Sequence, residues 1–202
     1  MTRVLAVDGA APEREALEAA GALLRAGALV AFPTESFYGL GANALDARAV
    51  GRMLGAKGRP SWKPVLVLVD SLEMAGAVTA EMSDGARELI ARHWPGALTL
   101  VLKAAPHVPP ALTAGTGTIG VRMPGHPVAL ALVRAARLPV TAPSANPSEA
   151  PPPLTAEAVR RYFEGQVELI LDGGPTAGGT GSTVADCTAW PPRVLRAGPV
   201  SL

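Results

Sequence analysis

Short apolar runs recur along the chain, and polar loops separate them. Such runs, rich in valine, leucine and isoleucine, are typical of buried β-strands. The sequence predicts strands at 4–7, 28–32, 65–69, 98–103, 118–122, 138–141, 167–172, 182–187 and 193–196.

Segments with apolar residues three or four positions apart lie between several of these strands and predict helices. Pro12 opens the first of them, acidic residues follow it, and Gly27 ends the helix. A further helix is expected over 126–137. Residues that can cap a helix N-terminus precede four more: Asp46, Ser71, Ser83 and Thr155.

The alternation of strands and helices predicts an α/β fold with a mostly parallel or mixed sheet. Two pairs of strands have no helix between them, and each is expected to be antiparallel. These pairs are 98–103 with 118–122, and 182–187 with 193–196. No internal repeat or linker divides the chain, so a single domain over 1–202 is expected.

The composition narrows the class of protein. Of the 202 residues, 49% are hydrophobic and only 17% are charged, which favours a buried core over a disordered chain. The net charge of +1 gives no global electrostatic case for a nucleic-acid or membrane partner. A single cysteine, Cys187, and the lack of a signal peptide or membrane-length apolar run lead us to expect a soluble, cytoplasmic protein.

Several familiar motifs fail in their context. The segment GTGTIG precedes a predicted strand instead of joining a strand to a helix, so it is not a dinucleotide-binding loop. The glycine-rich segment 173–183 has no lysine for a phosphate-binding loop. The three histidines do not have zinc-ligand spacing, so no metal site of the protein is expected. Ser144 lacks the flanking glycines of a hydrolase nucleophile.

Cations are concentrated in KGRPSWK, between a predicted helix and a buried strand. Lys57 and Lys63 are two of only three lysines, and Arg59 lies between them. Lysine and arginine together suit a polyphosphate ligand. The alternative is charge that complements a helix C-terminus.

Hydroxyl-bearing loops follow other predicted strands. PTESFYGLG offers Thr34, Glu35, Ser36 and Tyr38 before two glycines, and APSANPS fixes a serine and an asparagine between prolines. The alternative for each loop is an ordinary connection with no ligand.

Arginines near two further strand ends can bind an anion. Arg122 precedes a proline and can clamp a carboxylate or a phosphate, or it can make a surface ion pair. Ser182 and Thr183 begin one strand of the last pair, and Arg196 ends the other; a solvated hairpin edge is the alternative. With no catalytic histidine and no carboxylate pair, this profile favours chemistry by positioning and charge stabilisation, as in nucleotidyl transfer.

Six segments in order carry a resemblance that runs from about Val4 to Val200: FPTESFYGLGANALD, AKGRPSWKPV, PGALTLVL, GVRMPGHP, APSANPS and LDGGPTAGGTGSTVAD with VLRAGPV. They resemble the motif series of the YrdC/TsaC family of threonylcarbamoyl-AMP synthases. The resemblance implies a YrdC-like open twisted mixed β-sheet, with flanking helices, around a positively charged cleft.

The resemblance also implies a nucleotidyltransferase reaction. L-threonine, bicarbonate or CO2, and ATP would give threonylcarbamoyl-AMP and pyrophosphate, with Mg²⁺ entering with ATP. The partner proteins TsaD, TsaB and TsaE would then complete the t6A modification of tRNAs that read ANN codons. Direct binding of tRNA is left open.

The residue roles follow from the matching motifs. Lys57 and Arg59 are expected to be catalytic, near the phosphates and the carbamate. Contacts with L-threonine are expected from Thr34, Ser36, Arg122, Ala142 and Ser182, with Arg122 on the carboxylate. Contacts with ATP are expected from Arg59, Lys63, Thr118, Ser144, Asn146 and Arg196.

Three positions depart from the family pattern. Many relatives have asparagine at Lys63 and a threonine-binding histidine at Leu68, so threonine is expected to bind less tightly or in another pose. Glu149 replaces a glycine, so the loop on the ATP side is expected to differ in shape. The alternative function is a YciO-type paralogue that binds RNA or a nucleotide without synthase activity; the intact K-x-R and S-x-N motifs favour the synthase.

Overall fold

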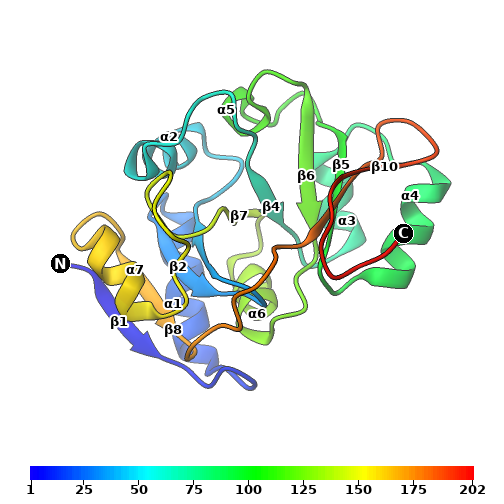
Figure 1. Ribbon diagram of the computed structural model, residues 1–202. Helices are drawn as coiled ribbons and strands as arrows, with labels where there is room; N and C mark the ends of the chain where they lie inside the picture. The colour runs from blue at the N-terminus through cyan, green and yellow to red at the C-terminus, as the bar shows by residue number, and fades with distance from the viewer.

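The computed structural model describes residues 1–202, and its strands form two open sheets where one was expected (Figure 1). The mixed α/β class is confirmed. One sheet has the order β1 (Arg3–Ala6), β8 (Leu169–Asp172), β2 (Val30–Pro33) and β3 (Tyr38–Gly41). The other has the order β10 (Arg193–Arg196), β9 (Thr183–Asp186), β5 (Leu98–Lys103), β6 (Thr118–Arg122), β4 (Leu66–Leu68) and β7 (Val140–Thr141).

Both antiparallel pairs that the sequence predicts are present. β5 pairs with β6, and β9 with β10, in antiparallel register. β1, β8 and β2 run parallel, as do β4 with β6 and β5 with β9. β3 is antiparallel to β2, so each sheet contains both parallel and antiparallel pairs.

β3 was expected to be part of a loop, and that prediction is wrong. It pairs antiparallel with β2, and all four of its residues are buried. The two glycines of β3 are residue types typical of loops, but here they leave space for an aromatic ring. A Cβ at Gly41 would lie 2.9 Å from the ring of Phe32, and one at Gly39 would lie 3.3 Å from it.

Seven helices flank the sheets: α1 (Arg14–Arg25), α2 (Ala47–Lys57), α3 (Leu72–Val78), α4 (Asp84–His93), α5 (Pro110–Thr113), α6 (Pro127–Ala136) and α7 (Ala156–Phe163). The side chains of Asp46, Ser71, Ser83 and Thr155 accept backbone N–H groups at the predicted N-caps. α1 begins two residues after Pro12, and the short α5 was not predicted. No helix is long and apolar enough to cross a membrane.

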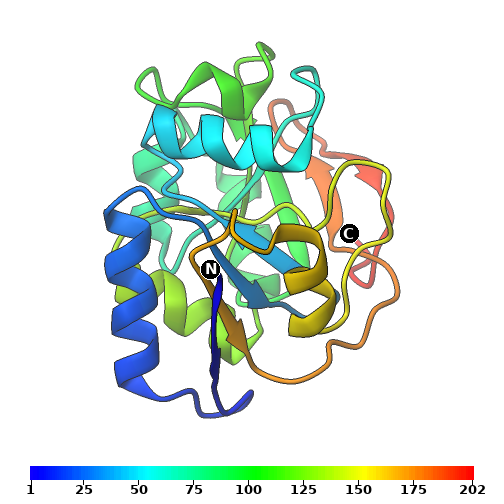
Figure 2. The ribbon, with the colours of Figure 1, turned by 90° about the vertical axis from the view of Figure 1, so that its left-hand side faces the viewer.

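The four-stranded sheet is covered on both faces. Val30 and Phe32 of β2 pack in the core cluster that contains residues of α1 and α6, whereas Ala31 packs in the cluster that contains residues of α7. In Figure 2, α1 and α7 lie on opposite sides of these strands. Because side chains alternate along a strand, neighbouring residues of β2 pack into two separate hydrophobic cores.

The six-stranded sheet is covered differently. Leu98, Leu100 and Leu102 of β5 pack against Ala86, Leu89 and Ile90 of α4. The intervening residues of the same strand point to the other face, where no helix covers them. That uncovered face is the floor of a large cavity.

Candidate active site

The floor of the cavity is built by alternate residues of the six-stranded sheet. The cavity has a volume of about 630 Å³, within the range of small-molecule sites. Thr99 and Val101 of β5 face it, because their neighbours face α4. The other floor residues come from β4, β6 and β9: Leu66, Leu68, Thr118, Gly120, Arg122, Val184 and Asp186.

Loops from both sheets form the walls. They bring together segments that are far apart in the sequence: 34–39, 142–144 and 181–182, together with Arg59 and the end of β10. Of the twelve predicted site residues, nine line the cavity: Thr34, Ser36, Arg59, Thr118, Arg122, Ala142, Ser144, Ser182 and Arg196. Lys57, Lys63 and Asn146 do not line it.

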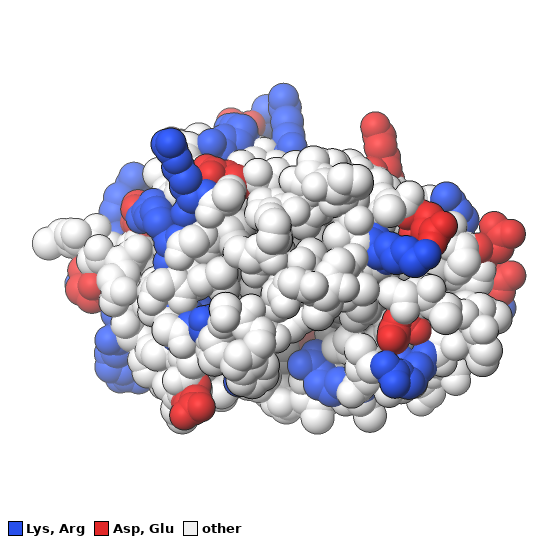
Figure 3. Space-filling model, turned by 90° about the horizontal axis from the view of Figure 1, so that it is seen from above, with Lys and Arg blue, Asp and Glu red and all other residues white.

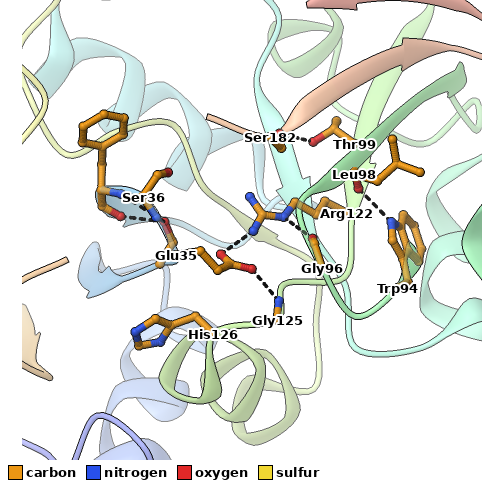
Figure 4. A network of polar contacts seen from close by, with 12 residues as sticks. Glu35, Ser36, Trp94, Gly96, Leu98, Thr99, Arg122, Gly125, His126 and Ser182 are labelled. Carbon is orange, nitrogen blue, oxygen red and sulfur yellow. Dashed lines mark hydrogen bonds and ion pairs between the residues drawn. The ribbon is translucent and has the colours of Figure 1, made fainter. Parts of the chain in front are cut away.

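Arg122 is held rigidly at one end of the cavity (Figure 4). Its Nε donates to the carbonyl of Gly96 at 2.8 Å, and its Nη2 makes an ion pair with the carboxylate of Glu35. The Arg122 side chain is only 6% exposed. No protein partner takes Nη1, which in Figure 4 is directed away from Glu35, into the space between Ser36 and Ser182. Two donors are therefore available to a ligand carboxylate.

Glu35 is fixed from a second side. Its Oε1 accepts the backbone N–H of Gly125 at 2.6 Å. Burial would raise the pKa of Glu35, but the charge and hydrogen bond of Arg122, together with backbone N–H groups, lower it overall. Glu35 is therefore ionised at neutral pH.

A second arginine stands across from Arg122. Arg196 donates from Nε and Nη2 to the carbonyl of Ser182, at 3.0 Å and 2.8 Å. The hydroxyl of Ser182 lies 2.7 Å from that of Thr99. Burial lowers the pKa of Arg196, and the positive charge of Arg122 lowers it further. Because the two guanidinium groups repel each other, an anion between them would be stabilised.

Leu68 lies beside Arg122 on the neighbouring strand, in direct register. An apolar side chain therefore faces this end of the cavity, at the position where the family resemblance led us to expect a histidine. Ser36 completes this end with a hydroxyl that has no partner in the protein, whereas the hydroxyl of Thr34 donates to the carbonyl of Phe37 at 2.7 Å.

Lys57 lies behind the cavity wall and is 2% exposed. Its ammonium donates to the backbone carbonyls of Ser144 and Asn146. Burial, and to a lesser degree the charge of Arg59, lowers the pKa of Lys57 to about 8. In this structure Lys57 supports the wall from behind. Its predicted role near the phosphates stays a prediction.

The loop 142–148 is also tied to β3. The N–H of Leu40 donates to the carbonyl of Pro143 at 2.8 Å, and the N–H of Ala145 donates to that of Tyr38 at 2.7 Å. These bonds present the Ser144 hydroxyl to the cavity without a protein partner. The loop is thus ordered before any ligand binds.

Asn146 lies behind the wall with Lys57. Its Nδ2 donates to the carbonyls of Pro147 and Ala150 at 2.9 Å and 2.6 Å, while its buried Oδ1 has no partner. The backbone of Glu149 has a φ of 71°, in the left-handed region that favours glycine. Glu149 therefore has a backbone conformation that a glycine would adopt with less strain.

Arg59 and Lys63, the other two cations of this segment, are placed differently. Arg59 lines the cavity and donates from Nη2 to the carbonyl of Pro64 at 2.7 Å. Burial lowers its pKa. Lys63 faces away, with its ammonium 4.9 Å from the centre of the exposed Trp62 ring.

Three residues near the ligand space were not predicted as site residues: Thr99, Asp186 and Glu35. Thr99 and Asp186 are polar positions on the floor face of strands whose other face is apolar, and that pattern was visible in the sequence. Glu35 was noted in its loop, but its partner lies 87 positions away in Arg122, and no sequence pattern joins them.

The cavity does not contain the donors of a resident metal ion. No group of three or more histidine, cysteine or acidic side chains is placed to hold one. Asp186 is the one carboxylate on the lining, and Thr188 and Arg193 already engage its oxygens.

The fold and the cavity together define a mixed α/β protein with a preformed cavity that Arg59, Arg122 and Arg196 help to line. The chain belongs to the Sua5/YciO/YrdC family, whose model, described as telomere recombination, matches residues 22–198. A threonylcarbamoyl-AMP synthase from Pyrococcus abyssi is 48% identical over 183 residues, which cover 91% of this chain and 54% of the relative.

Solved structures agree with the family. The crystal structure of P. abyssi Sua5 complexed with L-threonine has a TM-score of 0.92 at 45% identity, covering 96% of this chain and 57% of that one. That of E. coli YciO has a TM-score of 0.89 at 27% identity, covering 100% and 98%. The resemblance and the fold are confirmed. The chain spans about half the length of the first curated relatives that it matches.

Proposed function

We propose that this chain is an L-threonylcarbamoyladenylate synthase, a nucleotidyltransferase that forms threonylcarbamoyl-AMP and pyrophosphate from L-threonine, bicarbonate or CO2, and ATP. The observation that carries the proposal is Arg122, which is fixed on two sides and keeps Nη1 for a ligand. It is supported by relatives named as this synthase and by the L-threonine complex of P. abyssi Sua5.

The threonine end of the site is the part that the geometry defines best. In this proposal Arg122 binds the threonine carboxylate, and Arg196 across the cavity adds to its stabilisation. The free hydroxyl of Ser36 and the buried pair of Thr99 and Ser182 supply polar partners. The apolar side chain of Leu68 then meets the ligand beside its carboxylate instead of a histidine.

The ATP side is assigned to the opposite wall. The threonine amine takes up CO2 as a carbamate, whose oxygen attacks the α-phosphate of ATP while pyrophosphate leaves. The free hydroxyl of Ser144 and the guanidinium of Arg59 face this space. The protein's contribution is positioning and charge stabilisation, since no histidine lines the cavity and its single carboxylate is engaged.

Mg²⁺ belongs to this proposal as part of the ATP substrate, because the lining lacks the carboxylates of a resident site. Transfer of the product by TsaD, TsaB and TsaE to tRNA in the cytoplasm is proposed on the same basis, from the activity named for the relatives.

The test is pyrophosphate release by the purified chain with ATP, Mg²⁺, bicarbonate and L-threonine. Release should require L-threonine and should not occur when L-alanine replaces it. Mass spectrometry should identify threonylcarbamoyl-AMP in the same mixture. Pyrophosphate release that is indifferent to threonine would refute the proposal.

The second candidate, a YciO-type module that binds RNA without synthase activity, has less support. The face in Figure 3 carries Lys and Arg intermixed with Asp and Glu, with no continuous basic stripe, and the net charge is +1. Tight tRNA binding that falls steeply with salt, in the absence of turnover, would favour this candidate.

A further inference from the structure

Glu35 is a charged residue of the cavity end that the proposed reaction leaves unused. It lies between Thr34 and Ser36, both of which line the cavity, but Glu35 itself does not. Its carboxylate instead turns to Arg122, which is on the neighbouring sheet. A loop of one sheet is thus connected by charge to a floor residue of the other.

We infer that Glu35 is a positioning residue, which fixes the guanidinium of Arg122 so that Nη1 stays directed into the cavity. Arg122 held in this way selects ligands that have a carboxylate. This inference rests on the proposed function and names a determinant of its amino-acid specificity.

The geometry explains how one carboxylate sets the orientation. The carbonyl of Gly96 takes Nε at 2.8 Å, and Glu35 takes Nη2, so the planar guanidinium is held along two edges. With only one of these contacts the plane could turn about the remaining hydrogen bond. With both contacts, Nη1 has one direction, which Figure 4 shows between Ser36 and Ser182.

Glu35 is itself immobilised, so it can act as a fixed reference. The N–H of Gly125 donates to Oε1 at 2.6 Å, and Gly125 follows β6, the strand that carries Arg122, by three residues. A Cβ at Gly125 would lie 3.3 Å from Oε1 of Glu35 and 3.4 Å from the Cα of Gly96. The glycine therefore admits the carboxylate and the Gly96 segment together.

Charge compensation is the second consequence. Arg122 is nearly fully buried, and a buried charge without a partner is costly. Glu35 neutralises it in the absence of ligand. Arg196 lies near this pair and adds one positive charge. The two arginines and Glu35 together then carry a net charge of plus one, which a single ligand carboxylate would neutralise. An uncharged amide in its place would leave that positive charge unmatched.

The experiment compares L-threonine with L-threoninamide, which lacks the carboxylate, by calorimetric titration of the full chain. The wild type is expected to prefer L-threonine by at least about tenfold, as for a charge-assisted hydrogen bond from Nη1. The near-isosteric Glu35→Gln leaves one more positive charge uncompensated, but the loss of orientation is expected to outweigh that charge. The preference should therefore fall to within about threefold, with the KM for ATP unchanged.

A thermodynamic cycle tests whether Glu35 acts through Arg122. Glu35→Gln added to Arg122→Gln should change the preference no further, because the guanidinium it positions is gone. Glu168→Gln is the matched control, since Glu168 makes a half-exposed ion pair with Arg52 away from the cavity. The preference of this variant for L-threonine should equal that of the wild type. If Glu35→Gln does not fold, Glu35→Asp, which keeps the charge on a shorter side chain, should show an intermediate loss.

The outcomes separate the two proposals. A wild type that does not bind L-threonine refutes the proposed function. A wild type that prefers L-threonine, together with Glu35 variants that keep the full preference or lose ATP and threonine affinity alike, overturns the positioning role and leaves the proposed function intact.

Discussion

Two buried cations lie beside the cavity, and they use their hydrogen-bond donors differently. Lys57 donates to the carbonyls of Ser144 and Asn146, in its own wall. Arg122 gives Nε and Nη2 to Gly96 and Glu35 and retains Nη1. An ammonium and a guanidinium of equal charge are thus a structural anchor in one place and, in the proposed function, a ligand-binding group in the other.

The difference follows from side-chain geometry. A guanidinium has five donors in a rigid plane, so Nε and Nη2 can be fixed while the N–H groups of Nη1 stay available. The ammonium of Lys57 is a compact point charge, and the two carbonyls that it meets belong to the loop bearing Ser144. The comparison therefore predicts that the two residues affect different substrates.

The largest effect is expected from Arg122→Gln. Loss of the free guanidinium edge should lower kcat/KM for L-threonine by more than about 100-fold, as for the loss of a preorganised charged donor. It also leaves the partly buried Glu35 without its counter-charge, so the free energy of unfolding should fall by about 3 kcal/mol. Steady-state pyrophosphate release and urea unfolding measure the two effects. An unchanged KM for threonine would contradict the assignment.

Lys57→Ala should affect the other substrate. Without the ammonium, the loop that carries the Ser144 hydroxyl loses its anchor, so kcat/KM for ATP should fall by about 100-fold. Calorimetric affinity for L-threonine should be nearly unchanged. Arg59→Ala should resemble Lys57→Ala, because Arg59 faces the same side. Lys103→Ala, which removes only an exposed ion pair with Glu81, is the control and should retain wild-type rates.

The lowered pKa of Lys57 predicts a pH dependence of the unfolding free energy that a variant without this lysine should lack. Its pKa is about 8 in the folded protein, against a reference value of 10.5. Between these values the unfolded chain binds more protons, so the contribution of Lys57 to the unfolding free energy rises with pH, by up to about 3 kcal/mol. Urea unfolding at several pH values should show this rise in the wild type relative to Lys57→Met. Parallel curves for the two proteins would place the Lys57 pKa near its ordinary value.

The smallest effect is expected at the edge of the same wall. Glu149 has a φ of 71°, which is unfavourable for a residue with a side chain. Glu149→Gly should relieve that strain, offset in part by the greater entropy of glycine in the unfolded chain, for a net gain of about 0.5–1 kcal/mol. Chemical denaturation gives the sign, and a loss of stability would show that the Glu149 side chain contributes more than the strain costs.

Local features were the most predictable part of the fold. Asp46, Ser71, Ser83 and Thr155 cap helices as predicted, because a cap depends on residues within one turn. β3 was missed because its two glycines are typical of a loop, and only the ring of Phe32 across the hairpin explains them. The division into two sheets was also missed, since pairing between distant strands leaves no local pattern.

Most of the candidate site could be predicted from motifs that resemble a known family, and nine of the twelve residues line one cavity. The three others, Lys57, Lys63 and Asn146, lie in the same segments but behind the wall or outside the rim. A motif identifies which segment is involved, whereas the direction of each side chain depends on which neighbours compete for it.

The sequence by itself determined the class of fold, the N-terminal caps of four helices and the segments that meet at the cavity, because these follow from short-range periodicity, capping and motif order. Only the tertiary structure decided which cation keeps free donors. Lys57 is enclosed by the carbonyls of a loop almost ninety positions away, and Arg122 is held by Glu35 from the other sheet. Those contacts arise from the packing of distant strands, and so the division between anchor and binding group is a property of the folded chain.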